Sequence, residues 1–144
     1  MAAHKSWELA SAAVKLVRDV MLVQPGETVT ITADTAASEE IIEATARAAR
    51  ILDAVPVVIN VPLPPKAHLE PPAPLAEAIK VSDVWIEYAF RPIFFTTAYQ
   101  AAVAAGTRYL NVARAQPDWF IRVIGNVDYA RMIELGDRLL ELTN

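Results

Sequence analysis

The chain of 144 residues is long enough for one domain with a real core and short for two. A net charge of -4 with scattered Lys and Arg argues against a nucleic-acid surface, and the absence of Cys excludes disulfides, thiolate nucleophiles and sulfur metal sites. Apolar residues make up 54% of the chain, against roughly 45–50% in typical domains, so we expect an apolar surface patch for another subunit.

The apolar residues form neither the pattern of a membrane span nor that of a signal peptide. No apolar run approaches the ~18 residues that a membrane span requires. The amino-terminal stretch MAAHKSWELA has no apolar core of the signal-peptide type. We therefore expect a cytoplasmic protein with neither membrane nor nucleic-acid partners.

The chain begins with a helix, a turn and a strand. Apolar residues at three-to-four spacing predict a helix over about Ser6–Leu22 with a wide apolar face. Pro25 and Gly26 turn the chain. The following Thr28–Ala33 (TVTITA) is rich in β-branched residues, which favours a central strand.

A second helix and strand follow. The helix begins after Asp34 and runs to about Leu52, with Glu43 and Arg47 spaced to form an i,i+4 ion pair. Val55–Val61 (VPVVINV) is the second predicted strand. The prolines that crowd the next segment, Pro62–Pro74, favour an extended arm over packed structure.

The second half repeats the alternation. Leu75–Lys80 is a short helix before the third strand, Asp83–Tyr88. A longer helix starts at Thr96 or Thr97 and ends at a glycine, before a fourth strand at Tyr109–Val112. A proline then begins a short helix, and a last helix follows. The side of this last helix that we expect to be buried carries Tyr129, Met132, Ile133, Leu139 and Leu140.

This alternation predicts a single α/β domain over residues 1–144. We expect an open three-layer sandwich with a mainly parallel four-stranded sheet, Rossmann-like or flavodoxin-like. The stretch Val81–Val112 alone reads as a complete right-handed crossover unit. Ligands in such folds bind beyond the carboxyl ends of the strands. The candidate loops are Asp34–Ser38, Pro62–Pro74, Tyr88–Phe95 and Ala113–Pro117.

Several kinds of chemistry are excluded or disfavoured by these loops. The loop Asp34–Ser38 contains no glycine, which argues against NAD or FAD, and no Gly-Lys-Ser or Gly-Lys-Thr occurs. Neither His4 nor His68 has a second histidine at metal-binding spacing, so we expect no metal or cofactor held by this chain alone. No serine lies in a nucleophile elbow, and no catalytic residue is predicted.

The best local group of polar residues lies after the third strand. Arg91 could hold a carboxylate, and Tyr88 could offer a hydroxyl or a ring face. A pairing of Glu87 with Arg91 is the favoured structural alternative. With Asp34, whose alternative role is a turn former or helix cap, and Asn111, these are the predicted substrate- or partner-facing residues.

Aromatic residues crowd the same region. Together they could form a stacking platform, whereas strand and helix spacing explain most of them as core or as an apolar loop buried against a partner. They are Trp85, Tyr88, Phe90, Phe94, Phe95 and Tyr99.

Three long stretches carry a family resemblance. These are QPGETVTITADTAASEEIIEATARAARILDAVPVVINV, LAEAIKVSDVWIEYAFRPIFFTTAYQAAVAAGTRYLNV and IGNVDYARMIELGDRLLEL, spanning about Gln24–Leu142. They resemble the amino-terminal α/β domain of the aminopeptidase T type metallo-aminopeptidases, a superfamily that includes the dihydroxypyridine ring-cleaving dioxygenases.

The resemblance implies a division of labour. The family's metal ligands, a cluster of His, Glu and Asp, belong to a carboxyl-terminal domain that follows a helix resembling Asp128–Leu142. We therefore expect a small, non-catalytic subunit that pairs with a larger chain carrying iron or zinc and shares its small-molecule substrate. The alternatives are an independent small-molecule-binding protein and a homo-oligomeric structural domain.

Overall fold

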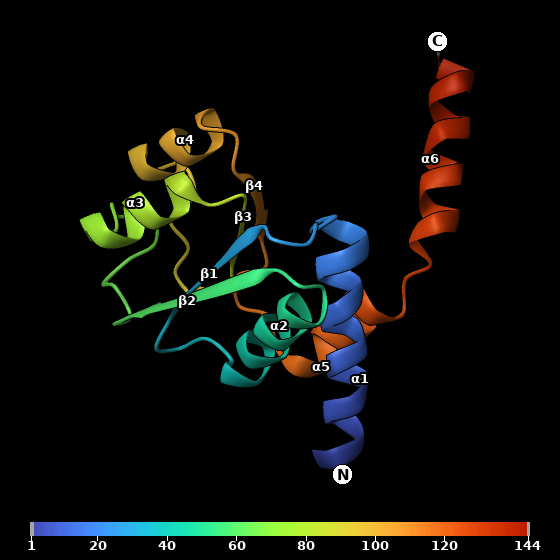
Figure 1. Ribbon diagram of the computed structural model, residues 1–144, viewed down its shortest axis with the longest axis horizontal. Helices are drawn as coiled ribbons and strands as arrows, with labels where there is room; N and C mark the ends of the chain where they lie inside the picture. Colours follow the sequence, from blue (N-terminus) through green and yellow to red (C-terminus); the bar gives the residue numbers. More distant parts are fainter. Residues whose placement is uncertain (1, 144) are drawn as a thin grey trace.

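The computed structural model describes residues 2–143, and the side chains from Lys5 to Thr143. Four parallel strands form one sheet in the order β2-β1-β3-β4 (Figure 1). They are β1 (Thr28–Asp34), β2 (Val55–Val61), β3 (Val84–Glu87) and β4 (Arg108–Asn111). This order is that of the flavodoxin-like doubly wound sheets. Pro56, which lacks an amide donor, lies in β2 at the edge of the sheet, where such a residue is tolerated.

Helices cover both faces of this sheet, as the α/β sandwich prediction requires (Figure 1). One face carries α1 (Ala2–Lys15), continued by the π-helical turn η1 (Leu16–Val20), with α2 (Glu39–Ile51) and α5 (Pro117–Phe120). The other carries α3 (Ala73–Val81) and α4 (Thr97–Ala104). A second π-helical turn, η2 (Ile121–Gly125), leads to α6 (Tyr129–Thr143). The predicted fold class is confirmed. Among the described residues, no helix has the length and apolar character needed to cross a bilayer.

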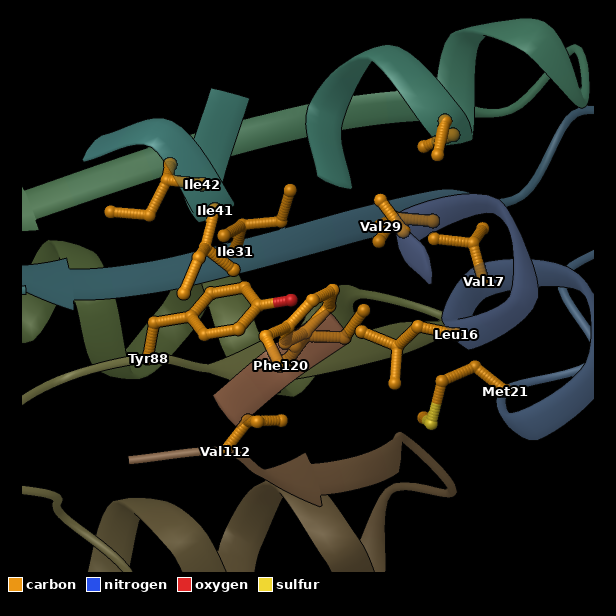
Figure 2. Close-up of a cluster of buried hydrophobic side chains, with 14 of the residues drawn as sticks. Leu16, Val17, Met21, Val29, Ile31, Ile41, Ile42, Tyr88, Val112 and Phe120 are labelled. Atoms are coloured by element: carbon orange, nitrogen blue, oxygen red, sulfur yellow. The ribbon is translucent and has the colours of Figure 1, made fainter. Parts of the chain in front are cut away.

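Strand alternation divides the buried side chains into two cores. Val29 and Ile31 of β1 face α1 and α2, where Phe120 of α5 closes the layer (Figure 2). Trp85 of β3 faces the opposite side and packs with Leu75 and other residues of α3 and α4. Because both faces are covered, β1 and β3 are buried along almost their whole length.

The polar residues within the second layer are paired. The indole nitrogen of the fully buried Trp85 donates to Thr32 Oγ1 at 2.8 Å, and the hydroxyls of Thr30 and Ser82 bond to each other. Each buried hydroxyl therefore has a partner, which avoids the free-energy cost of an unsatisfied polar group.

Helix α6 does not follow its prediction. It projects away from the sheet (Figure 1), and Met132, Ile133, Leu139 and Leu140 are more than half exposed. The expected buried side was wrong because no other element of the described chain lies against it. The amphipathic pattern was read correctly as helical, yet it does not say which surface the apolar side meets.

The segment that leads to α6 is nevertheless fixed to the domain. Lys15 Nζ donates to the carbonyl of Gly125 at 2.7 Å and to that of Val127 at 3.2 Å. Tyr129 Oη donates to the Ile124 carbonyl, and Asp128 Oδ1 accepts the amide of Arg131 at the start of the helix. The direction of α6 is thus set by bonds to α1 and η2.

The proline-rich segment also differs from its prediction. It is not a free arm, because it folds back over the carboxyl ends of the strands. The amide of Leu63 donates to Thr35 Oγ1 at 3.1 Å, and the amide of His68 donates to the Pro92 carbonyl at 2.8 Å. These bonds tie the segment to the loops that follow β1 and β3.

Candidate functional site

The strand order reverses between β1 and β3, which is where ligands bind in open parallel sheets. A cavity of about 180 Å³ opens at this point, between the proline-rich segment and the loop after β3. It is smaller than the ~300–1,000 Å³ of drug-sized pockets, so it suits at most one small ring. Its walls include Asp34, Pro64, Leu69, Glu87, Arg91 and Ile93.

A larger hollow of about 830 Å³ lies between α1 and α2. Its polar groups are largely committed, since Lys5 pairs with Asp118 at 2.9 Å and Arg47 with Glu43 at 2.8 Å, the latter as the sequence predicted. Strand order and buried carboxylates, and not hollow size, therefore select the cavity at the switch point as the candidate site.

Asp34 ends β1 and is almost completely buried. Its Oδ1 accepts the amide of Ala36 at 3.0 Å, and its Oδ2 accepts the amide of Arg91 at 2.9 Å. The first bond is the predicted turn-forming role. The second is a cross-link between the end of β1 and the loop after β3, and it occupies the other carboxylate oxygen.

Glu87 ends β3 and is also buried. Its Oε1 accepts the amide of Ile93 at 2.7 Å, and its Oε2 accepts the hydroxyl of Tyr109 at 2.6 Å. Burial raises the pKa of the Glu87 carboxyl above its ordinary value, although both hydrogen bonds act in the opposite direction. Burial of the Tyr109 hydroxyl, together with the neighbouring Glu87 charge, raises the pKa of Tyr109.

Arg91 lies on the cavity wall, partly exposed. Its guanidinium donates to the carbonyl of Pro64, which fixes the proline-rich segment against the loop after β3. Among the described side chains, Glu87 and Arg91 form no ion pair, so the favoured structural alternative was wrong. Each instead bonds to backbone or to a tyrosine, because the tight loop brings amide groups closer to Glu87 than the guanidinium.

The other two predicted residues lie apart from the cavity. Tyr88 points into the core beneath α2, where its hydroxyl and that of Thr45 bond at 2.7 Å and its ring packs near Phe120 (Figure 2). Burial raises the pKa of the Tyr88 hydroxyl. Asn111 pairs with Glu87 in the sheet register and is exposed, and its Oδ1 accepts the amide of Ala113 at 2.8 Å.

Several residues at this edge escaped the sequence interpretation. Tyr109 holds Glu87, and Glu70 accepts the amides of Thr97 and Ala98 at the start of α4. These bonds join positions 22 to 28 residues apart in the sequence. No periodicity within one element could have indicated them.

A metal ion does not fit the described residues. No group of three or more His, Asp or Glu side chains among residues 5–143 could hold one. The carboxylates of Asp34 and Glu87 are committed to amide groups and a tyrosine, and His68 Nδ1 bonds to the Phe94 carbonyl at 2.8 Å. The polar groups of this edge are thus bonded mainly to the backbone of neighbouring loops.

Comparison with known proteins gives the fold an independent context. The structure of the 2,5-dihydroxypyridine dioxygenase from Pseudomonas putida KT2440 superposes with a TM-score of 0.65 at 15% identity, covering 80% of this chain and 36% of that one. The McyG A-PCP structure complexed with phenylalanyl-adenylate matches with a TM-score of 0.54 at 11% identity, covering 85% and 21%. At these identities the likenesses concern the fold alone.

The chain spans about a third of the length of the dioxygenase structure that it matches. No curated protein matches it in a sequence search. The family model of NicX, 2,5-dihydroxypyridine 5,6-dioxygenase, matches residues 11–144, which is nearly the whole sequence. The chain therefore belongs to the NicX family of 2,5-dihydroxypyridine 5,6-dioxygenases.

Proposed function

We propose that this domain forms one wall of the substrate cleft of a dihydroxypyridine dioxygenase-like enzyme. The metal, iron or zinc, is held by a larger partner chain, and the domain itself is a non-catalytic subunit. The observation that carries the proposal is the family match over residues 11–144, in a chain whose described residues offer no metal-binding group.

The geometry of the carboxyl edge supports the role of a wall. The carboxyl oxygens of Asp34 and Glu87 accept amide hydrogens from the loop after β3. These bonds fix the shape of the cavity between them before any ligand arrives. A preformed wall of this kind can orient a small planar substrate against a reactive centre supplied by another chain. Its backbone bonds do not depend on the partner.

Ring cleavage is the reaction favoured over peptide hydrolysis. The family model names a dioxygenase, and the matched solved structure is that of a 2,5-dihydroxypyridine dioxygenase. The small volume of the cavity also suits a single ring better than a peptide. An aminopeptidase reaction is the competing outcome of the test.

The test uses the affinity-tagged chain purified with its partner. We expect a complex that contains iron and consumes oxygen when given 2,5-dihydroxypyridine. Hydrolysis of peptides without oxygen uptake would replace the reaction with that of an aminopeptidase. A chain that remains a monodisperse monomer, with no metal-bearing partner in the purified material, would overturn the subunit role.

A matched pair of variants tests the wall itself. Ala89 is buried and lines the cavity, whereas Ala104 is exposed at the end of α4. In the assembled enzyme, Ala89→Leu should raise KM for the pyridine about tenfold or more because it fills the cavity, and Ala104→Leu should leave KM unchanged. Equal KM values for both variants would contradict a substrate-facing cavity.

A second candidate function is independent binding of a small molecule. The observation in its favour is that the cavity combines apolar walls, such as Leu69 and Ile93, with the polar side chain of Arg91. Native mass spectrometry of the isolated chain should then retain a ligand, and Arg91→Ala should abolish retention by releasing the proline-rich segment. A spectrum that contains only the ligand-free mass of the wild-type chain would remove this candidate.

A further inference from the structure

Phe95 is an unusual residue in the loop after β3, two positions beyond Ile93, which lines the cavity. The residue is 73% exposed, and its backbone φ is 69°, in the left-handed region that bulky residues rarely adopt. Most of this side chain remains in contact with water, and its backbone conformation costs free energy on folding. Strain of this kind persists where the surrounding structure imposes it, and it gathers at ligand-binding sites.

The surrounding structure holds Phe95 firmly in this conformation. Thr96 Oγ1 donates to the carbonyl of Ile93 at 2.7 Å and accepts the amide of Tyr99 at the start of α4. The Glu70 carboxylate accepts the amides of Thr97 and Ala98, and these bonds lower the pKa of Glu70. Both flanks of Phe95 are therefore fixed by side-chain bonds.

The aromatic neighbours of Phe95 support its ring without stacking on it. Phe94 meets it edge to face with centroids 4.6 Å apart, and Tyr99 does so at 6.4 Å. The His68 ring lies tilted at 6.0 Å. Since no described ring lies parallel to Phe95 and most of its area is exposed, a face of the ring is open to a planar partner.

The two chain segments that meet at the Phe95 ring both continue into the wall of the cavity. Phe95 follows Ile93 by two residues, and His68 directly precedes Leu69, while Ile93 and Leu69 both line the cavity. The amide of Ile93 donates to Glu87, so the buried carboxyl also fixes the chain segment that leads to Phe95.

We propose that Phe95 is a specificity-determining residue whose ring stacks against the planar heteroaromatic ring of the substrate at the cavity rim. The assignment rests on the proposed function for the identity of the substrate. Stacking selects a flat, unsaturated ring over a saturated ring with the same hydroxyl groups. The strained backbone is retained because it turns the ring outward.

Leu22 supplies a matched control. Its φ is 51° and its side chain is 61% exposed, so it shares both the backbone strain and the exposed apolar surface. It follows η1 and precedes β1, which places it at the amino end of that strand, opposite the cavity. Replacing either residue with glycine relieves the same strain, but only one replacement removes the proposed stacking surface.

The experiment titrates the purified full chain with 2,5-dihydroxypyridine in the absence of oxygen, following the aromatic NMR signals. Phe95→Gly should weaken binding about tenfold, the upper part of the effect of one aromatic pair, and raise Tm by about 3 °C. Leu22→Gly should raise Tm similarly without changing Kd. Phe95→Tyr, which keeps the ring, should bind within about twofold of wild type. Cyclohexane-1,4-diol should bind weakly to every variant.

Three results would overturn the proposal. They are an unchanged Kd for Phe95→Gly, equal affinity of the wild-type chain for the pyridine and the saturated diol, and no binding of the pyridine by the wild-type chain. Loss of partner association in Phe95→Gly with unchanged ring binding would assign the ring to protein docking instead. The proposed function is judged separately, by metal content and oxygen uptake of the complex, so the two failures are distinguishable.

Discussion

Glu87 and Asp34 look alike in sequence, since each is an acidic residue at the end of a buried strand, and the structure gives them a shared task. Each accepts an amide from the loop after β3, at Ile93 and Arg91 respectively. The loop that forms one side of the cavity is therefore shaped by two carboxylates from neighbouring strands. Their primary role is to position backbone.

The raised pKa of Glu87 predicts a particular pH dependence of stability. Because the folded protein holds the Glu87 proton more tightly than the unfolded chain, the free energy of unfolding falls as pH rises through the interval from the ordinary glutamate pKa, about 4.3, to the higher folded value. Glu87→Gln should remove this contribution. Urea unfolding at several pH values should give a wild-type minus Glu87→Gln difference that falls with rising pH. A difference that rises would contradict the burial of the charge.

Asp34 should be more sensitive to truncation than an exposed aspartate. Asp34→Ala removes the buried carboxyl group that accepts the amides of Ala36 and Arg91, so we expect a loss of about 1.5–3 kcal/mol in the free energy of unfolding. The control Asp137→Ala, on the exposed α6, should change it by no more than about 0.5 kcal/mol. Urea denaturation measures both, and similar losses would show that the amide bonds are unimportant.

At the scale of elements, sequence patterns located helices and strands better than they located neighbours. TVTITA was expected as a central strand and forms β1, paired on both sides, because β-branched residues suit a strand covered on both faces. The same kind of pattern in α6 indicated a helix but misplaced its apolar side. The periodicity of a sequence describes one helix or strand. Burial depends on a second element that packs against it, and the local sequence does not indicate which element that is.

The site was only partly predictable for the same reason. The ends of β1 and β3 could be expected to meet, which placed Asp34 and Glu87 together. Tyr88 is adjacent to Glu87 yet points to the opposite layer, since successive side chains of a strand alternate. The bonds from Tyr109, Pro64 and Glu70 join distant segments, so no local signal announced them.

Two glycines near the carboxyl end should respond with opposite signs to the same substitution. A Cβ on Gly125 would lie 3.0 Å from Ala12 Cβ and 3.5 Å from its Cα, so Gly125→Ala should destabilise the protein by about 1–3 kcal/mol. A Cβ on Gly136 would meet no atom within 4 Å, and Gly136→Ala should favour the exposed α6 helix by about 0.5–1 kcal/mol.

Thermal unfolding of the Gly125→Ala variant measures the first effect directly. Helix content by circular dichroism measures the second, because α6 contributes few contacts to the cooperative core. A stable Gly125→Ala variant would mean that α1 and η2 can separate without cost. In that case the fixed direction of α6 would rest on the side-chain bonds of Lys15 and Tyr129.

For the whole molecule, the apolar excess of the sequence is visible on the surface. Exposed large apolar residues gather on α6 and include Leu139, Leu140 and Leu142, and others lie along the edge strand β2. Many of the other apolar residues lie in the two buried cores. The composition therefore indicated correctly that two packed layers would not absorb every apolar side chain.

An exposed apolar helix predicts association of the isolated chain. We expect the apparent mass in light scattering to increase with protein concentration, because burying the apolar side of α6 removes it from water. The double variant Leu139→Glu and Leu140→Glu should remain monomeric at concentrations where wild type associates. The control Glu134→Gln, on the same helix, replaces a polar side chain with another and leaves the apolar side intact, so it should associate as wild type does. A monomeric wild-type chain at all concentrations would contradict this expectation.

The bonding of Trp85 has a practical consequence. This indole is fully buried, donates to Thr32 and lies 4.3 Å from the ring of Tyr109, whereas Trp7 and Trp119 are substantially exposed. Its fluorescence should therefore resist quenching by acrylamide while the emission of the other two is lost. Since the Tyr109 hydroxyl also donates to Glu87, the protected emission offers an intrinsic optical reporter of the carboxyl edge of the sheet, read without any label.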